Sequence, residues 1–431
     1  MLFRSTTVLS GTLKYSASNV LSTGAVTVTN GTLDMNGQTD SVGTVTLTNG
    51  GQIIDSAGSA GVLTSTATYA LQGGFVSAKL GSAVAAGISK TTTDRVVLTG
   101  DNTFTSTSIA LSAGKLRIGH NNALGASGTT LATTVTSGAV LETYNGITVP
   151  STKTLTLNGT GIVAQGALLN VSDSNTIAGA VTLGATGVRI NSASGTLTCS
   201  GTMTGTGFAV TFGGAGNIVY SGAVNTSTAA TVTKDGAGTT TLSNANNYTG
   251  VTTISAGVLA ISNATSTGTT AGGVTVATGA AIQISNTITV GAEALTLNGS
   301  GISNDGAIRN TSGTNTWQGT VTLSSTSYLG SDSGSLALSG SITGSGSIGL
   351  TKVGAGTVSV ATTTLGGDLT ISAGTLTASG SVTISVGGSW SNSGTFTAGS
   401  STVAFTSTNT ATITGDTTFN NFSVTDRKSV V

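Results

Sequence analysis

A short internal repeat constrains the fold of this chain more than any other feature of its sequence. Residues 24–31, which read GAVTVTNG, return at residues 43–50 as GTVTLTNG, an offset of 19 residues. A second apolar group follows each copy, with Leu33 after the first and Ile53 after the second. One such coil cannot bury its apolar face, whereas a stack of coils can, with parallel strands in register about 4.8 Å apart. The repeat therefore predicts a solenoid.

Alternation of apolar and hydroxyl side chains identifies the strands of this solenoid. Segments such as Val26-Thr27-Val28 and Leu155-Thr156-Leu157 place one set of side chains on each face of a strand. Asn-Gly pairs follow many of these segments and mark tight corners, because both residues tolerate positive φ. No stretch shows the spacing of an amphipathic helix. We expect an all-β chain, a single-stranded right-handed parallel β-helix of roughly 20 coils.

A longer repeat contains several of these coils. Residues 98–104 match 242–248, and residues 155–162 match 295–302, so the offset drifts from 144 to 140 residues. The copies therefore differ by a few inserted or deleted residues in their turns, while the strands of one copy still align with those of the other. A third, partial copy begins near Leu350. The repeats favour one long β-helix over residues 6–366.

Composition excludes several classes of protein. The net charge of the 431 residues is zero and only 6% are charged, against roughly a quarter in an ordinary domain. With no basic block, a nucleic-acid or anionic-membrane partner is not expected. The apolar runs are too short for a membrane-spanning helix, so we expect no membrane insertion. A hydrophobic content of 37% with a single Pro argues against disorder.

The single histidine and the single cysteine do not indicate a reactive site. His120 lies in a loop without a second His or Cys nearby in sequence, and a metal site needs several ligands. We interpret His120 as a solvated turn residue. Cys199 alternates with Leu197 and stands where Leu338 stands in the next copy, which predicts a buried core residue.

Acidic residues leave an enzymatic alternative open. β-Helical polysaccharide lyases and glycoside hydrolases place carboxylates on the outer faces of adjacent coils. Asp34 and Asp55 come closest to this arrangement, but their separation of 21 residues does not match the local period of 19. General acid–base work needs two carboxylates at a set separation, and no such pair is evident.

Four charged residues lie close together in sequence near the first long repeat: Lys90, Asp94, Arg95 and Asp101. In the next copy Lys90 becomes Lys234, but the other three are replaced by uncharged residues. We expect a solvated ion pair in this cluster. No catalytic, cofactor-binding or metal-binding residue is assigned, and we expect the chain not to be an enzyme.

Aromatic and amide side chains are further candidates. Phe104, Tyr248, Trp317 and Trp390 either pack in loops, as aromatic residues usually do, or form exposed platforms for sugars. The amides of the corresponding pairs Asn102 and Asn246, and Asn170 and Asn310, are expected to donate to one neighbouring coil and accept from the other. The role of these amides is structural.

One segment resembles a known family. Residues 233–259, which read TKDGAGTTTLSNANNYTGVTTISAGVL, closely resemble the autotransporter-associated β-strand repeat of type V secreted bacterial proteins. Weaker copies cover residues 90–116, which lack the Gly-Ala-Gly, and 352–376, which lack the Asn-Tyr-Thr-Gly loop. The resemblance implies a right-handed β-helix, secretion through an outer-membrane translocator barrel that is missing from this sequence, and display on the bacterial surface.

The remaining segments differ from this repeat. Residues 367–425 resemble a second type of repeat from large bacterial surface proteins, and we expect them to continue the β-helix. Residues 1–5 and 426–431 resemble translated sequencing adapters and are expected to be non-native ends. The missing signal peptide then carries no weight against secretion.

The sequence therefore predicts a secreted, non-enzymatic surface β-solenoid. We expect a fragment of an autotransporter passenger that acts as a stalk or adhesin. Its partners are host glycans, receptors or sister rods, and it needs no cofactor. Two alternatives remain open: a β-helical polysaccharide lyase or glycoside hydrolase, and a phage or secreted fibre repeat.

Overall fold

The structure is a computed structural model that describes residues 5–21, 23–58, 60–83, 87–105, 108–407 and 410–425. In these ranges the regular elements are β-strands, apart from two one-turn 3-10 helices, η1 (Ile162–Ala164) and η2 (Ile302–Asn304). The strands pair in parallel and form a β-solenoid of about 19 turns. The predicted all-β solenoid of roughly 20 coils is thus confirmed. Two compact units, Met1–Ala223 and Val224–Val431, are described separately.

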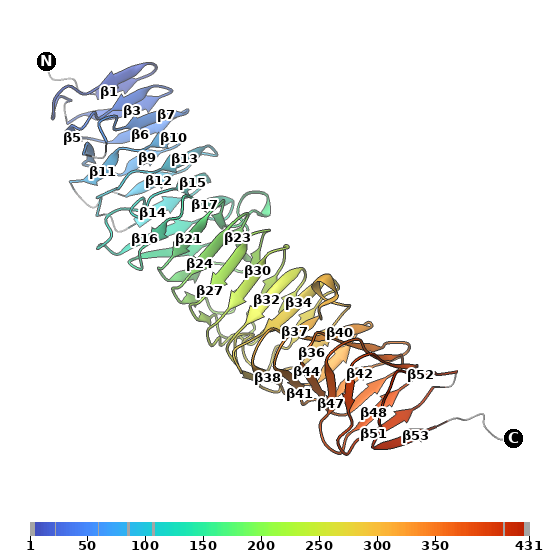
Figure 1. Cartoon of the computed structure of the whole chain (residues 1–431). Helices are drawn as coiled ribbons and strands as arrows, with labels where there is room; N and C mark the ends of the chain where they lie inside the picture. The colour runs from blue at the N-terminus through green and yellow to red at the C-terminus, as the bar shows by residue number, and fades with distance from the viewer. Residues whose placement is uncertain are drawn as a thin grey trace. The chain divides into compact units, whose positions relative to one another are not determined.

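Unit 1 contains four ladders of parallel strands (Figure 1). Ladder 1a consists of β1 (Ser5–Val8), β3 (Ala25–Thr29), β6 (Val45–Thr48), β9 (Tyr69–Leu71), β12 (Ile88–Lys90), β14 (Ser108–Leu111), β16 (Leu131–Val135), β19 (Lys153–Leu157), β22 (Val181–Leu183) and β25 (Met203–Thr204). Ladder 1b consists of β2 (Thr12–Lys14), β4 (Thr32–Asp34), β7 (Gly51–Ile54), β10 (Gly74–Val76), β13 (Arg95–Leu98), β15 (Gly114–Ile118), β17 (Ala139–Thr143), β20 (Leu168–Asn170), β23 (Val188–Ser192) and β26 (Val210–Gly213). Ladder 1c consists of β5 (Thr39–Val42), β8 (Val62–Ser65) and β11 (Lys79–Ser82), and ladder 1d of β18 (Thr148–Val149), β21 (Ser174–Ile177), β24 (Thr196–Cys199) and β27 (Asn217–Tyr220).

Unit 2 contains three ladders and the two-residue strand β28 (Val224–Asn225). Ladder 2a consists of β29 (Val232–Lys234), β31 (Thr252–Ile254), β33 (Val274–Val276), β36 (Leu295–Leu297), β39 (Val321–Leu323), β42 (Ile342–Gly344), β45 (Thr363–Leu365), β48 (Thr383–Val386), β51 (Thr402–Phe405) and β53 (Asn421–Val424). Ladder 2b consists of β30 (Thr239–Leu242), β32 (Gly257–Ile261), β34 (Ala280–Ile284), β37 (Ile308–Asn310), β40 (Ser327–Ser331), β43 (Leu350–Val353), β46 (Leu369–Ile371), β49 (Trp390–Asn392) and β52 (Ile413–Thr414). Ladder 2c consists of β35 (Thr289–Val290), β38 (Thr314–Trp317), β41 (Ser335–Leu338), β44 (Thr357–Val360), β47 (Thr375–Ala378) and β50 (Thr395–Thr397).

The apolar side chains of each strand face the interior of the solenoid. In β3 the alternation of Ala25–Thr29 becomes an alternation of burial, with Val26 at 1% and Val28 at 0% exposed. Val26 pairs directly with Val45 of the next coil, which is the register that the 19-residue offset predicts. The shared interior of adjacent coils supplies the burial that one coil lacks.

The turn amides of Asn102 and Asn246 join consecutive coils as predicted, whereas the Oδ1 of Asn310 accepts from Asn315 of its own coil. The Oδ1 of Asn102 accepts the backbone N–H of Leu80 at 2.9 Å, and its Nδ2 donates to the carbonyl of Ala123 at 2.8 Å. The corresponding residue Asn246 accepts from Val224 and donates to Ser266 of the following coil. The amides of Asn102 and Asn246 therefore each satisfy one backbone group of the coil before and one of the coil after.

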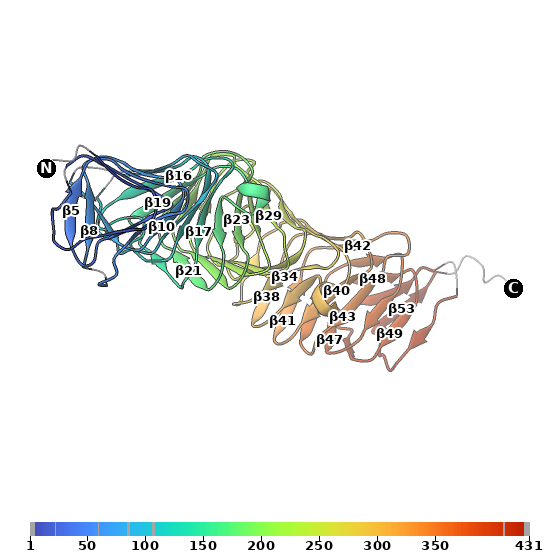
Figure 2. The ribbon, with the colours of Figure 1, turned by 90° about the horizontal axis from the view of Figure 1, so that it is seen from above.

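Two irregular loops link neighbouring strands, β19 to β20 in unit 1 and β36 to β37 in unit 2. Each contains one of the 3-10 helices, and in Figure 2 the short helix η1 stands out from the strands of unit 1. Val163 and Ser303 at the centres of these loops adopt left-handed φ values of 49° and 53°. Val163 is 89% exposed, so a β-branched residue occupies an unfavourable conformation on the surface.

The predicted segment boundaries remain predictions. Strands β46 to β53 continue ladders 2a, 2b and 2c through most of residues 367–425, but the assignment of this segment to a second repeat type is not tested. The expected non-native ends lie outside the described residues, except for Ser5, the first residue of β1.

Candidate functional site

The aromatic side chains considered as sugar platforms are buried. Phe104, Tyr248, Trp317 and Trp390 are each 0% exposed. The indole nitrogen of Trp317 donates a 2.7 Å hydrogen bond to the backbone carbonyl of Glu293. The packing interpretation is therefore confirmed for all four, and none of them offers a ring face to a ligand.

His120 and Asp101 lie together in a small polar cluster at a turn. The Nδ1 of His120 is 3.8 Å from the Oδ1 of Asp101, and the Nζ of Lys79 is 3.5 Å from its Oδ2. The Nδ2 of Asn122 donates to the same carboxylate at 2.8 Å, and this bond, with the nearby His120 and Lys79, lowers the pKa of Asp101. His120 is 38% exposed, in agreement with a solvated turn residue. Across the described ranges, no group of three His, Cys, Asp or Glu side chains is placed to hold a metal ion.

Asp34 and Asp55 do not form a carboxylate pair for catalysis. Asp34 pairs with Ile54 across the ladder, so the two aspartates are out of register as predicted, by one position rather than the two that a 19-residue period gives. Backbone N–H groups occupy both side chains: Ser56 donates to Asp34 at 2.9 Å, and Gly61 donates to Asp55 at 2.7 Å. These carboxylates stabilise turns.

Cys199 is a core residue, as predicted. Its side chain is 0% exposed, and it pairs with Tyr220 of the next coil. Burial raises the pKa of the Cys199 thiol to about 12. The thiol is therefore protonated at neutral pH, and the reactive thiolate does not form.

Lys90 does not take part in a solvated ion pair, and the prediction for its cluster is wrong in this respect. Lys90 is 0% exposed, and its Nζ donates to the carbonyl and, at 3.0 Å, to the hydroxyl of Thr92. Desolvation lowers the pKa of Lys90, and the charge of Asp94 partly opposes this effect. Asp101 pairs with residues of another turn, while Arg95 remains exposed.

Lys90 belongs to a set of buried lysines that bind backbone carbonyls. Lys352 is the clearest case, because its Nζ lies 2.8 Å from the carbonyl of Val353, 2.7 Å from that of Gly354 and 3.0 Å from that of Ala373. Three acceptors match the three donors of an ammonium group. Lys234 makes the same three contacts with its own turn and with the following coil.

The buried lysine explains why the repeat motif contains glycines at fixed positions. Gly257, which follows Lys234 by one coil, has a φ of +66°, and a Cβ there would collide with carbonyls of Gly236 and Gly238 and with the Lys234 Nζ. The Gly-Ala-Gly turn and the glycine of Ser-Ala-Gly thus leave room for a cation held by carbonyls. The sequence analysis did not predict that the lysine binds turn carbonyls. The signal for it is that Lys234 and Lys352 both stand shortly before a Gly-Ala-Gly turn.

A cluster on the outer face of ladder 1b was also missed. Arg117 of β15 pairs directly with Glu142 of β17, and its Nε lies 2.7 Å from the carboxylate. The Nζ of Lys115 lies 3.0 Å from the other carboxylate oxygen and 2.9 Å from the Oε1 of Gln165 in the η1 loop. The Arg117 guanidinium stacks 5.6 Å from the ring centre of Tyr144. Glu142 is 1% exposed, so its carboxylate is not accessible to a substrate.

Glu293 is a buried carboxyl group in unit 2. It is 1% exposed, and its Oε2 accepts a 2.6 Å hydrogen bond from the hydroxyl of Thr267. Its Oε1 is buried without a hydrogen-bond partner. Burial raises the pKa of Glu293 to about 7, and the Thr267 bond opposes the rise. The side chain is therefore protonated below neutral pH.

This arrangement predicts a pH-dependent effect of Glu293→Gln. The folded-state pKa of about 7 exceeds the unfolded value of 4.5, so the folded state binds more protons between these values and stability falls as pH rises through that window. We expect the variant to match the parent at pH 4 and to exceed its unfolding free energy at pH 8 by about 3 kcal/mol. Urea denaturation at both pH values measures this difference, and an equal difference at both would contradict the assignment.

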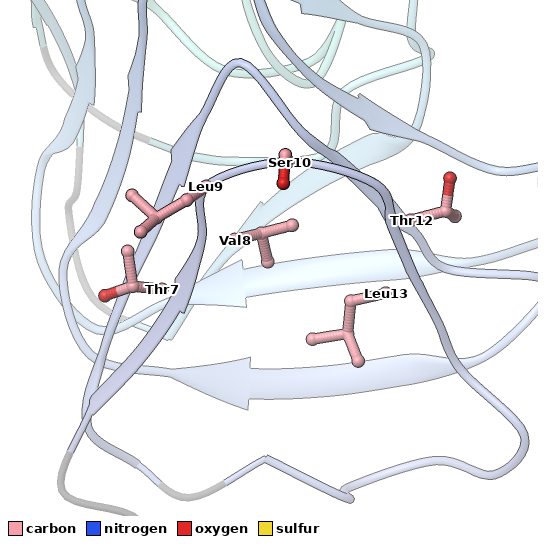
Figure 3. A pocket seen from close by; sticks show the side chains of 6 residues that line it. All are labelled: Thr7, Val8, Leu9, Ser10, Thr12 and Leu13. Carbon is pink, nitrogen blue, oxygen red and sulfur yellow. The ribbon is translucent and has the colours of Figure 1, made fainter.

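A hollow of ≈ 310 Å³ lies in the first described turn of unit 1. Figure 3 shows Val8 and Leu13 inside this turn, beneath the loop that carries Ser10. The residues that line it are Thr7, Val8, Leu9, Ser10, Thr12 and Leu13. These residues include no titratable side chain, so the hollow has no acid–base group for catalysis.

An uncharged column of threonines follows the outer face of ladder 2a, and we call it the threonine face. Each member pairs with the next one across adjacent strands. The members are Thr233, Thr253, Thr275, Thr296, Thr322, Thr343 and Thr364. Backbone hydrogen bonds place a second column beside it, in which Thr320, Ser341 and Thr362 are exposed. The face thus offers hydroxyl and methyl groups about 4.8 Å apart.

Comparisons with known proteins give one match. Residues 89–118 and 232–261 match the family model of the passenger-associated-transport-repeat. Both segments carry a buried lysine, Lys90 or Lys234, on the strand that begins the repeat. Neither a curated protein nor a solved structure matches the chain. Of the helices in the described part of the chain, none has the length and apolar character that crossing a membrane requires.

Proposed function

We propose a function from the premise that this chain is an autotransporter passenger domain, a β-solenoid that carries passenger-associated-transport repeats. In this proposal it is a non-enzymatic adhesin and stalk on the surface of a bacterium. Its partner in export is an outer-membrane translocator barrel, and its partners in adhesion are sister chains. The family of the repeat implies a secreted, surface-exposed protein, which supports this location.

The threonine face carries the proposal. Seven threonines in register form a regular surface without charge, so two such faces can approach each other without desolvating ions. Each hydroxyl can both donate and accept a hydrogen bond, so the face is complementary to a second copy of itself. Contacts of this kind are individually weak, but they repeat with each coil, and their sum grows with the length of the overlap.

The surroundings of three candidate carboxylates, Asp34, Asp55 and Glu142, favour adhesion over hydrolysis. An enzymatic site on a β-solenoid needs carboxylates that reach a substrate. Glu142 is buried beneath two cations, and Asp34 and Asp55 are held by backbone N–H groups. These contacts support the non-enzymatic proposal.

Aspartates on the threonine face are expected to abolish self-association. The variant Thr296→Asp/Thr343→Asp/Ser385→Asp changes two members of the face and Ser385, which pairs with Thr364 and continues the column. The three positions lie in alternate coils of ladder 2a, so the new charges do not stack within one chain. Two modified faces would repel each other, and burying the charges would cost desolvation. We expect beads coated with the parent chain to clump and beads coated with the variant to remain dispersed.

A matched variant tests whether the face itself matters. Thr316→Asp/Ser359→Asp/Thr397→Asp adds the same charge to the outward positions of alternate coils in ladder 2c. This control is expected to clump like the parent, with a similar melting temperature for all three proteins. Clumping of the threonine-face variant at the parental rate would reject the proposal.

A further inference from the structure

The outer face of ladder 1b concentrates the positive charge of unit 1. Arg95 of β13 pairs directly with Lys115 of β15, and Arg117 lies two residues further along the same strand. Like charges directly opposite each other in a sheet are destabilising, so this arrangement has a structural cost. We call Arg95, Lys115, Arg117 and the underlying Glu142 the cation face. The buried Glu142 balances only one of its three positive charges.

Unit 2 provides an internal comparison for this face. Strands β30, β32 and β34 repeat the pairing of β13, β15 and β17, with Thr239 opposite Val258 and Ala260 opposite Gln283. Arg95, Lys115, Arg117 and Glu142 are thus replaced by uncharged residues while the strands and their register are kept. The solenoid does not require the four charges, so they are an addition to the repeat rather than part of its fold.

The surroundings of the cation face indicate the chemistry of its ligand. Val97 and Phe75 continue the column of Arg117 toward the N-terminus, and both are partly exposed. A ligand that fits this face carries regularly spaced negative charges and also apolar C–H surfaces. Linear acidic polysaccharides combine both, and their sugar residues repeat at a distance similar to the strand spacing of about 4.8 Å. Duplex DNA presents a much denser array, with one charge per ~1.7 Å of helix axis.

We propose that the cation face binds a linear acidic polysaccharide that runs across the coils of ladder 1b. The carboxylate of one sugar contacts Arg95 on β13, that of the next sugar contacts Lys115 and Arg117 on β15, and a sugar ring packs against Phe75 and Val97. The proposal extends adhesion from sister chains to an anionic glycan, and it uses a face in unit 1 rather than the threonine face of unit 2.

The test replaces the cation face with the residues of the second unit. The variant Arg95→Thr/Lys115→Val/Arg117→Ala/Glu142→Gln removes all four charges together, which avoids leaving Glu142 buried without a partner. Binding of polygalacturonate to the full chain is measured by titration at low and moderate salt. We expect the parent to bind, with affinity that falls as salt screens the charges, and the variant to lose roughly tenfold or more in affinity.

Controls separate this proposal from general charge effects and from self-association. Neutral dextran is expected not to bind. Lys79→Thr removes a cation of ladder 1c that pairs with Asp101, and it is expected to leave the affinity for polygalacturonate within about twofold of the parent. Equal polygalacturonate affinity of the parent and the four-residue variant, or tighter binding of duplex DNA than of polygalacturonate by the parent, would overturn the proposal. Bead clumping should be unchanged in the variant, so a failure of this proposal and a failure of the threonine face are distinguishable.

Discussion

Leu157→Asp is expected to lower the free energy of unfolding by about 5 kcal/mol, through loss of apolar packing and burial of a carboxylate. Leu157 is 0% exposed, and it pairs with Val135 of the preceding coil and Leu183 of the following one. Removing its side chain takes one apolar packing partner from each of these neighbours. No backbone N–H group is free to donate to the new carboxylate, because those of the surrounding strands already donate to carbonyls of the neighbouring coils.

The charge of the new aspartate adds a pH dependence to this loss. Burial raises a carboxyl pKa, so the folded variant binds a proton more tightly than the unfolded chain does. The variant is therefore expected to lose more stability at pH 7 than at pH 3. Urea denaturation at both pH values measures the difference, with circular dichroism as the signal.

A neighbouring substitution is the control for Leu157→Asp. Thr156 precedes Leu157 in the same strand, but its side chain points outward beside those of Thr134 and Thr182. Thr156→Asp is expected to change stability by less than about 1 kcal/mol. If both variants melted like the parent, the inward register of β19 would be incorrect.

The fold was predictable because one physical requirement dominates the sequence. The apolar residues of one coil need those of the next, and the 19-residue offset correctly aligns Val26 with Val45. The Asn102 and Asn246 contacts were predictable for a similar reason, since a turn amide between two coils has backbone groups on either side. Both predictions depend only on contacts between neighbouring coils of similar length.

The candidate sites were less predictable because coil length varies. Arg117 and Glu142 are 25 residues apart, so the 19-residue offset does not bring them together, whereas the ladder places them side by side. The burial of Glu293 depends on Thr267 and Trp317, which belong to the coils before and after it. No local pattern distinguishes such a carboxyl group from a surface one.

The burial of the lysines could not be predicted from the sequence either. A lysine in a sequence is usually solvated, and the three nearby charged residues made an ion pair the natural prediction for Lys90. The structure instead surrounds the ammonium groups with carbonyls that the tight turns leave without strand partners. The lysine therefore satisfies acceptors that a turn would otherwise bury unpaired.

Lys352→Met is expected to destabilise unit 2 by about 3 kcal/mol or more, because it leaves buried carbonyls without donors. The methionine side chain keeps most of the apolar stem of Lys352, so the substitution removes chiefly the ammonium group. Three carbonyls lose their donor, those of Val353 and Gly354 in its own turn and that of Ala373 in the next coil. The pKa of Lys352 is lowered by burial to about 8, so the group that is lost at pH 7 is mainly charged.

The matched control is a lysine whose ammonium group lies near a carboxylate at the surface. Lys79→Met removes the 3.5 Å contact with Asp101, and both side chains are partly exposed. Such pairs contribute about 0–1 kcal/mol, so this variant is expected to melt close to the parent. Hydrogen exchange should further show faster exchange for Lys352→Met at the turn of Val353 and Gly354 and at the adjoining Ala373 turn. Equal free energies of unfolding for Lys352→Met and Lys79→Met would show that the bonds from the buried ammonium group to the carbonyls do not stabilise these turns.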